Sequence, residues 1–107
     1  MFCKKDSEGY RQLAQGVRMK TLVHGEKTLM GEFRIAKGAE VPTHAHPHEQ
    51  TGFMVSGKLR FDVDGQIFDA LPGDSWNIAG GKPHSATALE DAVAVEIFSP
   101  VREDYLP

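Results

Sequence analysis

Glycine and proline interrupt this chain so often that few stretches are long enough for an amphipathic helix. Eleven glycines and six prolines are spread along 107 residues, and the windows between them lack an apolar stripe with a period of 3.6 residues. Short runs with strand-like alternation fill these windows instead. Between two such runs, Asp64-Gly65 is a strong signal for a two-residue hairpin turn. We expect strands at residues 17–23, 28–36, 50–55, 58–63, 66–70, 75–78, 84–89 and 92–98.

Many short strands with closely spaced turns predict an all-β sandwich or barrel. A chain of 107 residues has the length of one domain, so we expect residues 1–107 to form a single domain. Apolar residues make up 40% and charged residues 25% of the chain. This balance is typical of a folded globular protein and unlike that of a disordered one.

The last expected strand is apolar on both of its faces. One face carries Val93, Val95 and Ile97, and the other carries Ala92, Ala94, Glu96 and Phe98. A strand of this kind is usually covered on both sides. One face can line the interior of the barrel, and the other then needs a second layer, which for so small a barrel can be another subunit. We therefore expect a homodimer.

Charge and composition argue against several classes of partner. The net charge is −3, and a duplex-binding protein normally carries a basic stripe, so we expect no nucleic-acid partner. No apolar stretch approaches the ~18 residues of a membrane span, and the first residues lack the apolar core of a secretory signal. The single cysteine, Cys3, cannot form an intrachain disulfide, which suits a reducing cytoplasm. We therefore expect a cytoplasmic protein without a membrane partner.

Three of the five histidines fall within residues 43–50. Side chains alternate along a strand with a period of two, so His44 and His46 are expected to point the same way, and Gln50 shares their parity. His84 follows a Gly-Gly-Lys-Pro turn and can supply a fourth ligand. Three imidazoles and one oxygen suit a transition metal and leave positions open for water or substrate. Spacing alone leaves open a metal site or a set of surface histidines.

The same residues resemble the two sequence motifs of the cupin superfamily. The first motif matches Gly38, His44, His46, Gln50 and Gly57, and the second matches Gly73, Gly81 and His84. Gln50 stands where most cupins have glutamate, and Ala79 and Ala88 replace the usual proline and asparagine. The resemblance covers residues 17–98, with its core motifs at 38–57 and 73–88. It implies a cupin barrel, also called a double-stranded β-helix or jelly roll, with one divalent metal held by His44, His46, Gln50 and His84.

A glutamine ligand has a physical consequence for the metal. Three neutral imidazoles and a neutral amide leave the full charge of a divalent cation, whereas a glutamate would cancel one unit. The metal is then a stronger Lewis acid and favours an anionic ligand, although it is bound less tightly. Glu49 is the rival ligand, but its parity is wrong for a regular strand. His48 follows Pro47, and we expect it in the pocket rather than on the metal.

A finer resemblance connects the chain with the small pectin-degradation cupins of the KdgF type. It rests on residues 44–50, 55–57, 89–91 and 98–106. Those dimeric cupins convert cyclic unsaturated monouronates from pectin and alginate into linear keto acids, with a metal on three histidines and a glutamine. Their other functional residues are an aspartate, a phenylalanine and an arginine. The resemblance places these at Glu96, Phe98 and Arg102, and Glu96 departs from the aspartate by one methylene.

The chemistry of such a substrate suggests a role for each residue. Glu96 is the expected general acid and base, and Arg102 is the expected bidentate clamp on the substrate carboxylate. Phe98 and His48 are expected to contact the sugar, and the metal acts as a Lewis acid. Simpler interpretations stay open, because Glu96 can merely orient a metal ligand, Arg102 can form a surface ion pair, and Phe98 and Trp76 can be core residues.

Two other functions are compatible with the fold, because cupins host many activities. One is a metal-dependent dioxygenase of the quercetinase-like type, which needs iron, nickel, copper or manganese and consumes oxygen. The other is a non-catalytic cupin that binds a sugar acid or another small anion. The sequence leaves the identity of the metal open among Zn, Ni, Mn, Fe, Co and Cu.

Overall fold

The computed structural model describes residues 1–107 and contains eight strands and one short 3-10 helix. The elements are β1 (Arg11–Ala14), β2 (Val17–His24), β3 (Leu29–Ile35), β4 (Glu40–His44), β5 (Glu49–Val63), β6 (Gln66–Ala70), β7 (Ser75–Ile78), β8 (His84–Ser99) and η1 (Glu103–Tyr105). The structure has no helix with the length and apolar character needed to cross a membrane. The eight strands confirm the predicted all-β fold.

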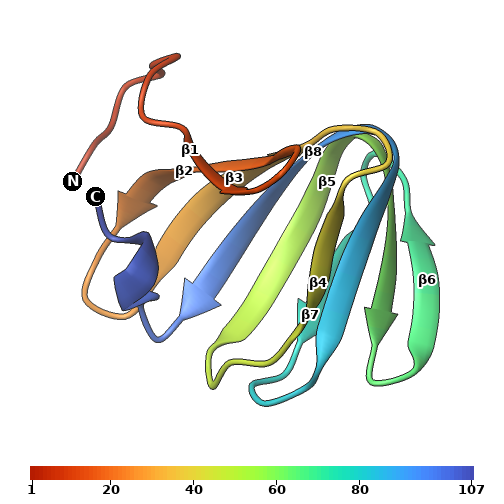
Figure 1. The fold of residues 1–107 in the computed structure, drawn as a ribbon. Helices are drawn as coiled ribbons and strands as arrows, with labels where there is room; N and C mark the ends of the chain where they lie inside the picture. Colours follow the sequence, from red (N-terminus) through yellow and green to blue (C-terminus); the bar gives the residue numbers. More distant parts are fainter.

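Two long strands, β5 and β8, belong to both layers of the barrel. They pair with each other along their whole length, from Glu49 opposite Ser99 to Val63 opposite His84. The C-terminal half of β8 also pairs with β3, and its N-terminal half pairs with β4. The two halves of β5 pair in the same way with β7 and β6. One layer is thus β1-β2-β3-β8-β5-β7 and the other is β4-β8-β5-β6, folded over each other at the shared strands (Figure 1).

The structure corrects the expected breaks at residues 56–57 and 90–91. Instead of two strands each, β5 and β8 are continuous through these positions. The ladder between them shifts register three times between Met54 and Leu59, and such bulges bend a strand without ending it. Gly57 has a φ of 80°, and a Cβ there would lie 1.9 Å from the carbonyl oxygen of Asp91. Glycine therefore allows the bend where the two strands cross from one layer to the other.

Local turn signals place the hairpins correctly. Asp64 and Gly65 both have positive φ, at 50° and 88°, as a two-residue turn between twisted strands requires. The bounds of β6 and β7 agree with the expected residues 66–70 and 75–78. The sequence did not predict β1 or β4, which are short and have no buried residue.

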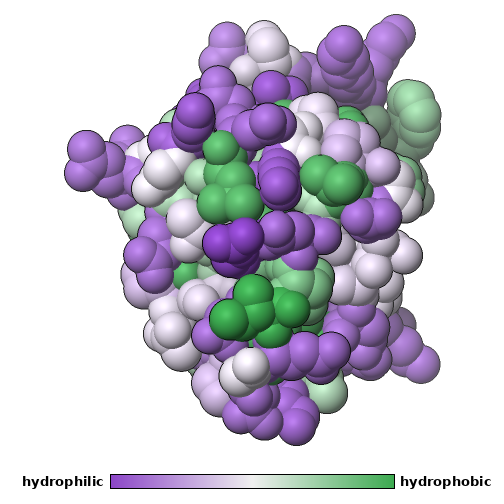
Figure 2. Space-filling view, turned by 90° about the vertical axis from the view of Figure 1, so that its right-hand side faces the viewer, coloured by the Kyte–Doolittle hydropathy of each residue, from purple (hydrophilic) through white to green (hydrophobic).

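The inner faces of the strands form the core, as their alternation predicts. Leu59 and Phe61 of β5 are buried with Ala92 and Ala94 of β8 in one apolar cluster between the layers. A smaller cluster contains Met19, Leu29, Phe33 and Phe98. On the β6 side the outer surface is mostly hydrophilic, with apolar atoms in separate patches (Figure 2).

Candidate metal centre and cavity

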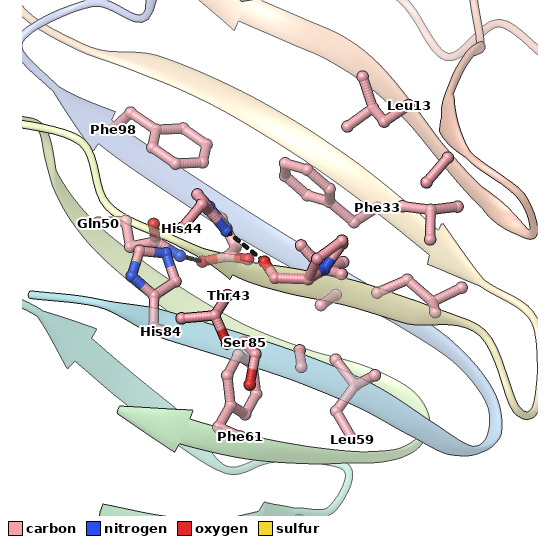
Figure 3. A pocket seen from close by; sticks show the side chains of 18 of the residues that line it. Leu13, Phe33, Thr43, His44, Gln50, Leu59, Phe61, His84, Ser85 and Phe98 are labelled. Carbon is pink, nitrogen blue, oxygen red and sulfur yellow. Dashed lines mark hydrogen bonds between the residues drawn. The ribbon is translucent and has the colours of Figure 1, made fainter. Parts of the chain in front are cut away.

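A cavity of about 420 Å³ lies between the two layers of the barrel. Its polar groups gather at one end, where His44, His84 and Gln50 lie together, whereas Leu13 and Leu59 lie toward the other end (Figure 3). The polar lining also includes Thr43, Ser85, Glu96, Arg102 and Asp104. A cavity that is largely apolar with a few convergent polar groups is typical of a small-molecule site.

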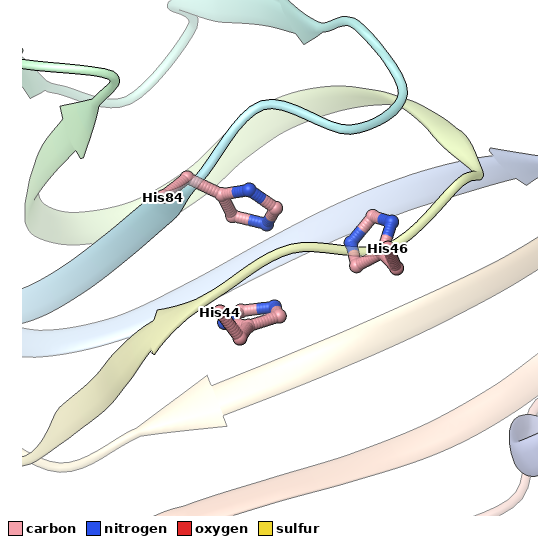
Figure 4. A group of neighbouring side chains, drawn as sticks. All are labelled: His44, His46 and His84. Carbon is pink, nitrogen blue, oxygen red and sulfur yellow. The ribbon is translucent and has the colours of Figure 1, made fainter.

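Three histidines from separate segments converge at the polar end (Figure 4). His44 is the last residue of β4, His46 lies between β4 and β5, and His84 is the first residue of β8. One ring nitrogen from each lies within 4.8 Å of the others. The pairing of β4 with β8, which puts His44 opposite His84, brings the two cupin-like motifs together.

His44 and His46 do not lie on one strand, as their spacing predicted, although the two side chains do converge. The strand β4 ends at His44, so His46 is not on it. The backbone around His46 is instead held against the Gly80-Gly81 turn. The Gly81 N–H donates to the carbonyl oxygen of His46 at 2.8 Å, and a Cβ on Gly80 would lie 2.2 Å from the carbonyl oxygen of Pro47. Close backbone packing that only glycine permits therefore positions His46.

Each histidine is held in a tautomer that leaves Nε2 free to bind a metal. The Nδ1 atoms of His44, His46 and His84 lie 2.9, 3.0 and 2.8 Å from backbone carbonyl oxygens of Pro42, His48 and Lys82. A carbonyl oxygen only accepts, so each Nδ1 carries the hydrogen and each neutral ring presents the lone pair of Nε2. Metal-binding histidines usually donate their second ring N–H in this way.

The electrostatics of the site also favour neutral imidazoles. Burial, together with the charge of Arg102, lowers the pKa of His46 to about 4. Burial likewise lowers the pKa of His84. Both rings are therefore unprotonated at neutral pH, which is the form that binds a metal. Nε2 of His46 and Nε2 of His84 are buried without a hydrogen-bond partner, and buried polar atoms are rarely left unpaired. The residues present thus fit a bound divalent metal.

Gln50 and Glu49 point in opposite directions from β5. Gln50 is 4% exposed, its Nε2 donates to Oε2 of Glu96, and its Oε1 is buried without a partner. The carboxylate of Glu49 is on the exposed side and accepts a hydrogen bond of 3.0 Å from Asn77. The geometry therefore favours Gln50 over Glu49 as an oxygen ligand beside the histidines.

Glu96 is a buried acid on the wall of the cavity. It is 8% exposed, and its Oε2 accepts hydrogen bonds from Gln50 and, at 3.3 Å, from Nε1 of Trp76. Burial raises the pKa of Glu96 to about 7, although these bonds and Arg102 act in the opposite direction. A carboxylic acid that titrates near neutrality can both donate and accept a proton under physiological conditions.

Arg102 lies at the cavity, with a side chain only 10% exposed. Its Nε and Nη2 donate to the two carboxylate oxygens of Asp104 at 3.0 and 2.7 Å. The guanidinium carbon lies 4.2 Å from the ring centre of Tyr105 and 5.2 Å from that of Phe98. Arg102 is thus a buried cation that forms an ion pair with a residue for which no role was predicted.

The other expected substrate contacts differ in their placement. Phe98 is 2% exposed, belongs to the small apolar cluster and also lines the cavity. His48 is not part of the cavity lining, and its ring lies 5.6 Å from that of His46. No site role was predicted for Trp76, Asp104 or Tyr105. The alternation of β7 places Trp76 on the inward face with Ile78, which is the one local signal for it.

Comparison with known proteins identifies this architecture. Residues 31–99 match the family described as Cupin domain. The chain belongs to the cupin family. This cupin is 26% identical over 103 residues to the pectin degradation protein KdgF of Dickeya dadantii (strain 3937), and the match covers 94% of each chain. Its structure is similar to that of KdgF from Halomonas sp., with a TM-score of 0.92, 27% identity and coverage of 99% and 98% of the two chains.

Two further similarities are broader. A cupin described as RmlC-like from Shewanella frigidimarina has a TM-score of 0.92 and 28% identity, with 98% of this chain and 95% of that chain covered. Quercetin 2,3-dioxygenase of Bacillus subtilis (strain 168) is 32% identical over 87 residues, which cover 76% of this cupin but 26% of the dioxygenase. The predicted KdgF-like cupin is confirmed by the family match and by the two KdgF proteins.

Proposed function

We propose that this cupin is a metal-dependent enzyme that converts cyclic 4,5-unsaturated uronates from pectin or alginate into linear keto acids. The observation that carries the proposal is the position of Glu96, a buried acid with a pKa of about 7. It lines the same cavity as the cation of Arg102 and as His44 and His84 of the histidine cluster. The similarity to KdgF proteins supports the same substrate class.

The proposed metal ligands are His44, His46, His84 and Gln50. This set is supported by three buried atoms that have no hydrogen-bond partner, namely Nε2 of His46, Nε2 of His84 and Oε1 of Gln50. A divalent metal bound there supplies Lewis acidity toward a substrate oxygen. Because all four donors are neutral, the site keeps a net positive charge and attracts an anionic sugar.

Glu96 is proposed to move the proton. The substrate carries a ring double bond next to the ring oxygen, so opening requires a proton on one carbon of the double bond and water on the other. Protonated Glu96 gives its proton to the first carbon, and the added water then returns a proton to the carboxylate. The hemiketal formed releases the ring oxygen as a hydroxyl and leaves a ketone. Both hydrogen bonds to Glu96 use Oε2, so Oε1 is available to the substrate.

Arg102 and Phe98 are proposed to hold the sugar. The guanidinium of Arg102 matches the geometry of a planar carboxylate and binds the uronate at the cavity. The ring of Phe98 lines the same cavity and packs against the C–H face of the sugar. His48 lies outside the lining, so a contact of His48 with substrate requires a ligand that extends beyond the cavity.

The test follows an unsaturated monouronate by NMR with the metal-loaded protein. We expect linear product to form faster than in buffer, and Glu96→Gln to lower kcat by roughly 10²–10⁴-fold, as loss of a general acid and base does. The same variant keeps its metal. A rate equal to the spontaneous one for the wild-type protein contradicts the proposed function.

Oxygenase activity is the second candidate, favoured by the 32% identity with the Bacillus dioxygenase. An oxygen electrode with a flavonol substrate separates the two reactions, because uronate ring opening consumes no oxygen. Oxygen uptake that depends on the flavonol and on the metal assigns the chain to this second class.

We also propose that the outer face of β5 and β8 forms a homodimer interface. Phe53 is 50% and Ile97 37% exposed on this face, and Phe53 is paired with the half-buried Val95. Exposed apolar side chains that adjoin across two strands are typical of an interface. Light scattering is expected to give a dimer mass for the wild type and a monomer mass for Phe53→Glu. A monomeric wild-type protein contradicts this proposal.

A further inference from the structure

We propose that Asp104 is a positioning residue that fixes the guanidinium of Arg102 for the binding of a carboxylate ligand. The inference rests on the proposed function only in that Arg102 is the group that binds the substrate carboxylate. Nothing in the cupin motifs draws attention to Asp104, which stands in the short helix η1 after the last strand.

The first observation is the edge of Arg102 that Asp104 occupies. The two carboxylate oxygens accept from Nε and Nη2, at 3.0 and 2.7 Å. This is the side edge of the guanidinium fork. A guanidinium has five N–H donors in one plane, so the adjacent end edge, with Nη1 and the second hydrogen of Nη2, remains for another planar anion. Asp104 therefore binds Arg102 without using the edge that a substrate carboxylate needs.

The second observation is that the faces of the guanidinium are also fixed. Its carbon lies 4.2 Å from the ring centre of Tyr105 and 5.2 Å from that of Phe98. Both aromatic residues line the cavity, as do Arg102 and Asp104. Stacking restrains the tilt of the plane, and the bidentate pair restrains its rotation within that plane.

The third observation is that the backbone brings Asp104 back to Arg102. In η1 the N–H of Tyr105 donates to the carbonyl oxygen of Arg102 at 3.0 Å. The hydroxyl of Thr21 on β2 donates to the carbonyl oxygen of Tyr105. This turn is therefore attached to the barrel, and Asp104 is held by more than its own ion pair.

The burial of the two side chains indicates that Asp104 positions Arg102, and not the reverse. The side chain of Arg102 is 10% exposed and that of Asp104 is 58% exposed. The guanidinium is thus the buried member of the pair and the carboxylate the more exposed one, and both residues line the cavity. An arginine fixed before binding loses less conformational freedom when a ligand arrives, which increases affinity. The competing interpretation is that Asp104 occupies the position of the substrate carboxylate on Arg102 and must be displaced before the substrate binds. In that case, removal of the Asp104 charge would increase the affinity.

The test compares Asp104→Asn with the control Glu103→Gln, both in the metal-loaded protein. Glu103 is the exposed neighbour in the same helix and makes no side-chain hydrogen bond. Galacturonate, a saturated uronate, serves as the unreactive probe in calorimetry. We expect Asp104→Asn to raise its Kd and the KM for unsaturated uronate about tenfold, which is about 1.4 kcal/mol. We expect kcat to change less than about threefold, because Glu96 and the metal ligands are untouched. Asp104→Glu restores part of the affinity.

A readout that does not depend on substrate accompanies these measurements. The Nε–H proton of Arg102, observed by NMR, is expected as a resolved signal in the wild type and in Glu103→Gln, and is expected to be lost in Asp104→Asn. A signal that persists in Asp104→Asn overturns the proposal. Unchanged or tighter galacturonate binding in Asp104→Asn also overturns it, provided that Arg102→Ala weakens binding. A third outcome separates the two proposals. If the Nε–H signal is lost in Asp104→Asn but Arg102→Ala binds galacturonate as tightly as the wild type, Asp104 positions Arg102. In that case, Arg102 does not bind the substrate carboxylate, and this part of the proposed function is wrong.

Discussion

The amide of Gln50 on β5 donates to the carboxylate of Glu96 on β8, and this bond turns the other end of the amide toward the histidines. A carboxylate accepts and does not donate when ionised, so Gln50 presents Nε2 to Glu96. Its Oε1 is then left without a partner in the buried space beside the histidine cluster. The proposed acid and the proposed oxygen ligand are thus parts of one hydrogen-bonded unit, which leaves the amide oxygen of Gln50 without another partner.

Removal of the oxygen ligand is expected to weaken metal binding. Gln50→Ala leaves three imidazoles and removes the amide oxygen, so the Kd for Zn²⁺ or Ni²⁺ is expected to rise about tenfold or more, which is at least ~1.4 kcal/mol. Thr51→Ala, the exposed neighbour on the opposite face of β5, serves as the control. Calorimetry of the metal-free proteins measures both constants. Equal metal affinity in wild type and Gln50→Ala would remove Gln50 from the ligand set.

Metal binding is expected to stabilise the fold through the histidines. A ligand at 100 times its Kd that binds only the native state adds about 2.7 kcal/mol, which raises the Tm of a domain of this size by roughly 10 °C. Differential scanning fluorimetry with and without added metal measures the shift. The shift is expected to disappear in His84→Ala and to persist in His24→Ala, since His24 lies at the end of β2 outside the cluster. A full shift in His84→Ala contradicts the proposed site.

The metal-free protein is expected to show opposing pH effects from two groups. The pKa of His46 is lowered to about 4 by burial and by Arg102. Between pH 6.5 and 4, His46 is therefore protonated in the unfolded chain but not in the native state. This lowers stability as the pH falls. Burial raises the pKa of Glu96 to about 7, so the native state keeps a proton that the unfolded chain has lost between pH 7 and 4.5. This raises stability as the pH falls.

Glu96→Gln removes the second effect and keeps the first. The free energy of unfolding of this variant is therefore expected to fall more steeply than that of the wild type between pH 7 and pH 4.5. Urea unfolding of the metal-free proteins at several pH values gives both curves. His46→Asn is expected to show the opposite change, with a smaller loss than the wild type. Parallel curves for all three proteins contradict the assigned directions.

Gly52 is expected to be essential for the position of Trp76. A Cβ on Gly52 would lie 2.2 Å from the ring of Trp76 on the neighbouring strand β7. Gly52→Ala must therefore displace the indole that donates to Glu96, and we expect a loss of about 1–3 kcal/mol in unfolding free energy, typical of overpacking. Gly25→Ala is the matched control, since no atom lies within 4 Å of the position that its new methyl group would take. Similar stability of the two variants would contradict the close packing.

Local and long-range features of this protein differ in how far the sequence predicts them. Turn chemistry predicts the Asp64-Gly65 hairpin, because the φ angles of those two residues depend on their own side chains. The continuity of β8 through Asp91 was not predicted, because it depends on pairing with the bulged strand β5. The hydrogen bond from Trp76 to Glu96 likewise joins strands that are distant in sequence.

The candidate site shows the same distinction. The histidine cluster was predicted from spacing and from the cupin motifs, yet the reason given for the direction of His46 was wrong. Its position depends on the Gly80-Gly81 turn, which lies more than thirty residues later in the sequence. The ion pair of Arg102 and Asp104 was not predicted. In a sequence, a run of charged residues such as 102–104 looks the same whether its side chains form ion pairs or are solvated.

The continuous strand β8 has a consequence for insertions and deletions. His84 begins this strand and Glu96 lies within it, so the two groups are separated by a fixed number of residues along one extended backbone. Deletion of one residue between them would reverse the direction of every later side chain, turning Glu96 out to solvent and Ile97 into the cavity. Extra residues in the hairpin turn at Asp64-Gly65 would leave that spacing unchanged. Related chains can therefore vary in their turns, whereas the length of β8 between these two residues is constrained.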